Sequence, residues 1–150
     1  MLKRKIRDML VRHNREVCVY GFGKNGVRTF WLLREYGCFE DCFADRDEYK
    51  QHIDIPGIRC ISYEKLLEKD RNILLVVSIG DGKELVRSFK KLGFSNVCSL
   101  RQVEKALKKS KQKRFKKVYD INEAIELKKK VENWLLFKKE IVIEEFFEED

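Results

Sequence analysis

The sequence predicts an α/β protein built on a small doubly wound parallel sheet of about five strands, in the order 3-2-1-4-5. Short runs that are apolar almost throughout alternate with amphipathic helical segments. Such runs are typical of strands buried on both faces of a parallel sheet. A glycine-rich loop also joins the first run to the first helix. Right-handed crossovers then give the stated order most simply.

Each element follows from its local pattern. Apolar spacing predicts an amphipathic helix over residues 2–14 and others beginning near Val27 and Leu85, the last ending near Gly93. Ser62 is the expected N-cap of a short helix over 63–68, and Pro56-Gly57 marks a turn. Strands are expected at residues 17–20, 39–44, 58–61, 73–79 and 96–100.

Charge divides the chain into four parts: a basic amphipathic helix (1–16), a nucleotide-binding domain (17–100), a basic helix or linker (101–118) and a helical tail (119–150). The linker holds nine Lys or Arg against one Glu, whereas the tail ends in acidic residues. We expect residues 101–112 to be too basic to bury. An apolar stripe along 120–142, including Trp134, predicts packing on the domain, on a second copy or on a partner enzyme.

The loop Gly21-Phe22-Gly23-Lys24-Asn25-Gly26 lies between a strand and a helix, the context of a Rossmann-like nucleotide site. Gly21 permits the turn, Gly23 lets a diphosphate approach the backbone, and Gly26 lets helix and strand pack closely. The helix N-terminus attracts an anion, and Lys24 adds a cation. The alternative is a domain whose glycines serve only the turn and the packing.

Four further residues are predicted to complete the site. Asp45, at the end of the second strand, is placed to bind the ribose hydroxyls of NAD, and Arg46 could favour NADP. A nucleotide sugar or S-adenosylmethionine would also fit. Ser78 and Asp81 follow the fourth strand and should face the same crevice.

Four segments carry a resemblance to a known family: VYGFGKNG, FADRD, IPGIRCISYEKLL and ILLVVSIGDGKEL. Over residues 17–100 the chain resembles the Rossmann-like modules of bacterial surface-sugar proteins. These are the C-terminal domain of sugar C-methyltransferases and the N-terminal domain of nucleotide-sugar O-acyltransferases. The resemblance implies a nucleotide or nucleotide-sugar ligand and an accessory role in polysaccharide biosynthesis. The catalytic parts of those enzymes have no counterpart here.

Other function classes find less support. Cys38 and Cys42 lack the further ligands of a zinc site, and no spacing defines a catalytic constellation. The chain holds no apolar run long enough to cross a bilayer and no signal peptide, so a cytoplasmic protein is expected. Nucleic acid is not the expected partner of the basic run. The runner-up function is a scaffold that binds a protein or nucleic acid through that run and the terminal helices.

Overall fold

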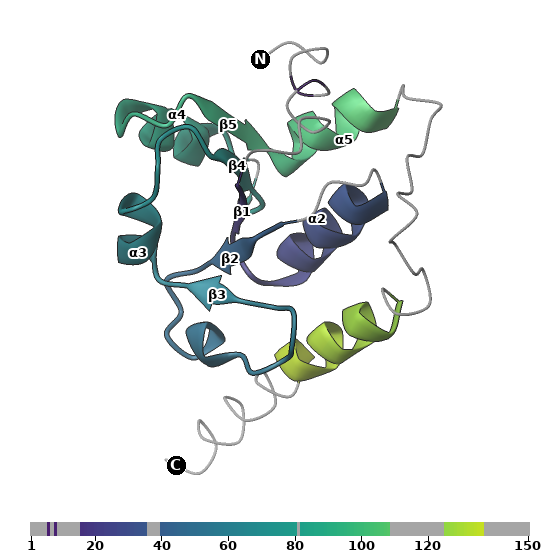
Figure 1. The fold of residues 1–150 in the computed structure, drawn as a ribbon. Helices are drawn as coiled ribbons and strands as arrows, with labels where there is room; N and C mark the ends of the chain where they lie inside the picture. Colours follow the sequence, from purple (N-terminus) through teal and green to yellow (C-terminus); the bar gives the residue numbers. More distant parts are fainter. Residues whose placement is uncertain are drawn as a thin grey trace, which may run out of the picture.

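The computed structural model describes residues 6, 8, 16–35, 40–80, 82–108 and 125–136. Its parallel sheet has the predicted order, β3-β2-β1-β4-β5 (Figure 1). The strands are β1 (Val17–Tyr20), β2 (Cys42–Ala44), β3 (Cys60–Ile61), β4 (Leu74–Val77) and β5 (Asn96–Ser99). The strand order reverses between β1 and β4, which is where doubly wound proteins open a crevice at the carboxyl edge.

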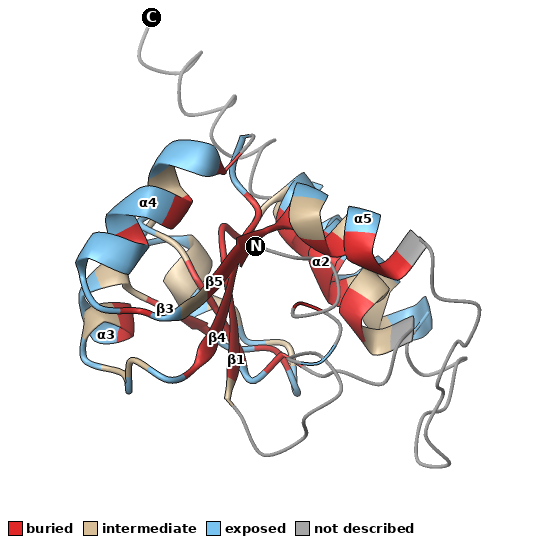
Figure 2. Cartoon of the chain, turned by 90° about the horizontal axis from the view of Figure 1, so that it is seen from above, coloured by how far each residue is buried: buried red, intermediate tan, exposed pale blue. Residues whose placement is uncertain are grey.

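The helices lie on both faces of this sheet. They are α2 (Lys24–Glu35), α3 (Tyr63–Leu67), α4 (Lys83–Lys91) and α5 (Leu100–Lys108), with a 3-10 turn η1 (Lys50–His52) and a further helix over 125–136. Seen from above, α3 and α4 cover one face and α2 and α5 the other (Figure 2). No described helix has the length and apolar character to span a membrane.

The sheet separates two hydrophobic cores, and alternate residues of each strand enter opposite ones. In β1, Val17 and Val19 join the core on the α2 side, whereas Cys18 and Tyr20 join the core on the α3 and α4 side. All four are buried. A strand whose successive side chains are all buried must be apolar throughout, which explains the uniform runs in the sequence.

The predicted N-cap of α3 and the predicted glycine at the end of α4 are both confirmed. The Ser62 side chain accepts a hydrogen bond from the backbone N–H of Lys65 at 3.1 Å, as an N-cap does. Gly93, which follows α4, has φ of +101°. An L side chain rarely adopts this conformation, so glycine is suited to the end of that helix.

The expectation that residues 101–112 are too basic to bury is wrong for the part that the structure describes. Within α5, Val103, Ala106 and Leu107 are buried in the core on the α2 side, while Arg101 and Lys105 are exposed. Helical periodicity places the three apolar residues on one face and the basic residues on another. A high net charge therefore did not prevent burial of one face.

The terminal helices are described in part. Ile6 and Asp8 are both helical, with Ile6 buried and Asp8 exposed, as the predicted amphipathic helix requires. In the tail, the helix over 125–136 packs on the domain through Val131, which is 1% exposed. Residues 109–124 and 137–150, and thus most of the basic run and the acidic end, lie outside the described residues.

Candidate functional site

The glycine loop connects the buried end of β1 to α2, and two of its glycines are required by the fold. Gly21 has φ of +105°, and a Cβ there would lie 2.6 Å from the Ser78 hydroxyl oxygen. A Cβ on Gly26 would lie 2.1 Å from the Gly21 carbonyl oxygen. Gly21 thus makes the turn, and Gly26 lets α2 pack closely against the end of β1.

Gly23 differs from both. It has no positive φ, and the nearest atom to an added Cβ would be the Lys50 ammonium nitrogen, at 3.7 Å. That separation is ordinary van der Waals contact, so packing does not exclude a side chain. Its carbonyl accepts the N–H of Val27 at 3.0 Å and so begins α2. Gly23 is thus the N-cap of α2, where glycine is one of several favoured residues, but neither a positive φ nor close packing requires it.

Gly23 lines a cleft of about 770 Å³ between the first half of α2 and the helix over 125–136. The two helices lie side by side in Figure 1. Apart from Gly23, the cleft is lined by four cationic side chains, one carboxylate, one amide and several apolar side chains: Lys24, Arg28, Lys50 and Lys128, then Glu132, Asn25, Val27, Trp31, Leu135 and Leu136. Its volume lies in the range of small-molecule sites. Such a lining suits a ligand with an anionic part and an apolar or planar part.

The cations of the cleft differ in how their charge is balanced. Arg28 pairs with Glu104 at 2.7 Å, and Lys50 lies 3.6 Å from a carboxylate oxygen of Asp45. Lys128 lies 3.6 Å from a carboxylate oxygen of Glu132, which also lines the cleft. Lys24, in contrast, has no carboxylate within 4.0 Å among the described residues. It is exposed and stands at the first position of α2, where free backbone N–H groups add positive potential.

Asp45 follows β2 at the predicted place, and its carboxylate holds the loop. One oxygen accepts the backbone N–H of Phe22 at 2.8 Å, and the other accepts that of Asp47 at 2.8 Å. The Lys50 ammonium is the third partner. A carboxylate has about four acceptor positions. A ribose hydroxyl could share this group, but Asp45 also has a structural reason to be acidic.

Phe22 contributes to the core rather than to the cleft. Its side chain is fully buried and stacks on Phe43, with ring centroids 4.4 Å apart. The Trp134 ring lies nearly parallel to the Phe22 ring, with the two centroids 6.4 Å apart. The centroids of the Trp134 and Tyr49 rings are 5.4 Å apart. These rings connect the glycine loop to the helix over 125–136. The tail therefore forms one wall of the cleft.

Of the other predicted site residues, Ser78 and Arg46 do not line the cleft. Ser78 is 2% exposed, and its hydroxyl lies 3.0 and 2.9 Å from the carbonyl oxygens of Tyr20 and Gly21, so it secures the loop. The Arg46 guanidinium lies 4.3 Å from the centre of the Tyr63 ring, on the side of α3 and α4. Asp81 is outside the described residues. Asn25, like Lys24, lines the cleft.

Sequence reasoning missed several residues of this cleft, most clearly Lys50, Trp31 and Lys128. Lys50 lies in the polar loop after β2, and any loop that follows a parallel strand reaches the same edge of the sheet as the glycine loop. Its position after a parallel strand could therefore have indicated, from the sequence, that Lys50 lies near the glycine loop. Lys128 comes from a helix a hundred residues further along, and no local pattern links it to the loop.

Comparison with known proteins assigns this chain to no family. The sequence matches no protein-family model, and no curated protein is significantly similar to it. The resemblance to surface-sugar modules therefore stays a prediction. Within the described ranges, no group of three His, Cys, Asp or Glu side chains could hold a metal ion.

Proposed function

We propose that this chain binds a nucleotide-type small molecule, NAD(P) or a nucleotide sugar, in the cleft beside the glycine loop. The observation that carries the proposal is the glycine at position 23. Other residues would cap α2 equally well, and neither the φ of Gly23 nor its packing requires glycine, yet it lines the cleft. Close approach of a diphosphate to the backbone gives this position a reason to lack a side chain.

The surrounding residues support the same ligand class. Lys24 and the N-terminus of α2 supply unbalanced positive charge, and Lys50 lies within van der Waals reach of a Cβ at Gly23. A diphosphate seated on Gly23 would meet both lysines. Trp31, Leu135 and Leu136 line the same cleft and would pack against a base or nicotinamide ring.

Thermal unfolding against NAD, NADP, S-adenosylmethionine, UDP- and CDP-sugars and coenzyme A tests the proposal. A ligand at 100 times its Kd adds about 2.7 kcal/mol, which for this size raises Tm by roughly 5–10 °C. We expect a shift with one of the nucleotide ligands. No shift with any member of the panel would contradict the proposal.

Matched variants separate loss of binding from loss of folding. Gly23→Val places a branched side chain where the diphosphate would lie and should abolish the shift. Lys24→Gln should weaken binding about tenfold, because a charge-assisted contact contributes roughly 1.5–3 kcal/mol and this lysine is exposed. Lys65→Gln removes an exposed charge on α3, away from the cleft, and should change nothing. Equal shifts in all three variants would refute the site.

A further inference from the structure

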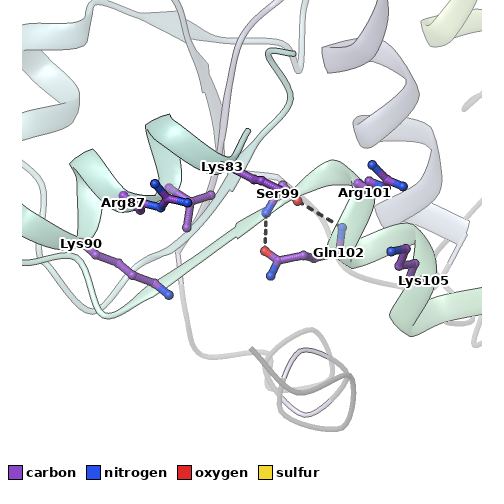
Figure 3. Close-up of a pocket in the computed structure, with 8 residues that line it drawn as sticks. Lys83, Arg87, Lys90, Ser99, Arg101, Gln102 and Lys105 are labelled. Atoms are coloured by element: carbon purple, nitrogen blue, oxygen red, sulfur yellow. Dashed lines mark hydrogen bonds between the residues drawn. The ribbon is translucent and has the colours of Figure 1, made fainter. Parts of the chain in front are cut away.

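A second hollow, of about 450 Å³, lies between α4 and the start of α5, at the carboxyl end of β5 (Figure 3). Five basic residues line it: Lys83, Arg87 and Lys90 from α4, and Arg101 and Lys105 from α5. Among the described residues that line it there is no carboxylate. It shares none of its lining residues with the cleft at the glycine loop. We call it the basic groove.

Helical spacing explains why these cations come together. The three on α4 are four and three residues apart, and the two on α5 are four apart, so each set follows one face of its helix. Each helix buries other residues in the cores, including Phe89 of α4 and Val103 of α5. In Figure 3 the two basic sets flank the end of β5, with Ser99 and Gln102 between them.

The acidic residues of the two helices lie outside the groove. Glu104 of α5 pairs with Arg28 of α2 at 2.7 Å, and Glu84 of α4 is not among the residues that line the groove. Within the described part of the chain, Arg87, Lys90, Arg101 and Lys105 have no carboxylate within 4.0 Å. Like charges gathered without a counter-charge repel one another, and a bound anion relieves this repulsion.

A fixed amide adds a neutral donor to the groove. The Ser99 hydroxyl accepts the backbone N–H of Gln102 at 3.1 Å, and the Gln102 side-chain oxygen accepts the N–H of Ser99 at 3.0 Å. This reciprocal capping box fixes the orientation of the Gln102 amide. Its oxygen is engaged by the backbone, which leaves the amide NH₂ group to donate to an anionic oxygen in the groove.

The geometry points to a second binding site in the basic groove, for a compact anion with two or more phosphoryl groups. The four cations without a carboxylate partner and the oriented amide match several phosphoryl oxygens, and the volume suits a short phosphate chain. The described residues that line the groove include no aromatic side chain on which a base could stack. The phosphoryl groups of a free polyphosphate or of a nucleic-acid backbone share this chemistry, and the compact volume favours the free anion.

Isothermal titration of the full chain with tripolyphosphate tests this site. We expect binding that weakens when the salt is raised to about 0.15 M, because exposed charges are screened. Arg87→Gln with Arg101→Gln should lower the affinity at least about tenfold, since two charge-assisted contacts are lost. Lys65→Gln with Lys130→Gln removes the same charge from exposed positions outside the groove and should change the affinity less than about twofold.

Each contrary result overturns the proposal. Unchanged binding in the double arginine variant places the anion elsewhere. Equal losses in both double variants attribute binding to net charge alone. A single-stranded RNA that binds more tightly than tripolyphosphate, and depends on the same arginines, makes the groove a nucleic-acid surface instead. Circular dichroism of the apo variants checks that both double variants are folded.

Discussion

Replacing Gly26 by alanine tests the close packing of α2 on β1. Gly26 is the third residue of α2, where alanine would ordinarily stabilise a helix by about 1 kcal/mol. Here the new Cβ would lie 2.1 Å from the Gly21 carbonyl oxygen. Real Cβ atoms essentially never come within 3.0 Å of such a neighbour, so α2 must move by about 1 Å.

The net effect follows from these opposing contributions. Overpacking a well-packed site costs about 1–3 kcal/mol, and the upper end applies because the obstructing atom belongs to the backbone. After the helical gain is subtracted, Gly26→Ala should lower the free energy of unfolding by about 2 kcal/mol. For a chain of this size that corresponds to a fall in Tm of roughly 4–8 °C.

Urea unfolding followed by far-ultraviolet circular dichroism measures this change. Gly23→Ala is the matched control, because its Cβ would meet no atom closer than 3.7 Å. The control should stay within about 1 kcal/mol of the wild type, the difference between glycine and alanine at a helix N-cap. A Gly26→Ala protein as stable as the wild type would refute the close approach of α2 to the loop.

Two further predictions concern titratable groups. Burial raises the pKa of Glu40 above its ordinary value of 4.5, despite the Arg34 guanidinium at 2.9 Å. The folded state then binds the proton more tightly than the unfolded chain, so stability falls as pH rises above about 4.5. Urea titrations should show that the free energy of unfolding of Glu40→Gln rises relative to that of the wild type across that range. A difference in stability that does not change with pH would contradict the raised pKa of Glu40. Burial also raises the pKa of the Cys60 thiol to about 12. Peptide mapping should find Cys60 unalkylated at pH 8 until denaturant is added, and rapid alkylation of the native protein would contradict its burial.

The three glycines of the loop show how a nucleotide-type motif combines two demands. Gly21 and Gly26 are required whether or not a ligand binds, so their presence alone does not indicate function. Gly23 is the informative position, because the folded chain tolerates a Cβ there. Substitutions at 23 and 26 should therefore act on different quantities, ligand affinity in the first case and stability in the second.

The sequence by itself determined the architecture. Strands buried on both faces must be apolar throughout, and helical crossovers between parallel strands have one hand, so the runs and their spacing predicted the order 3-2-1-4-5. Ser62 was equally predictable, because an N-cap acts on the backbone N–H of a residue only three positions away. These features depend on local chemistry or on rules of chain connection.

Tertiary structure alone decided which side chains remained available for a ligand. Ser78 and Asp45 follow strands as predicted, but long-range backbone contacts engage the Ser78 hydroxyl and the Asp45 carboxylate. Lys128 reached the cleft only because the helix over 125–136 packs beside α2. The basic groove likewise required α4 and α5 to lie side by side at the end of β5. Contacts between residues far apart in the chain depend on how whole elements pack, and no local pattern encodes them.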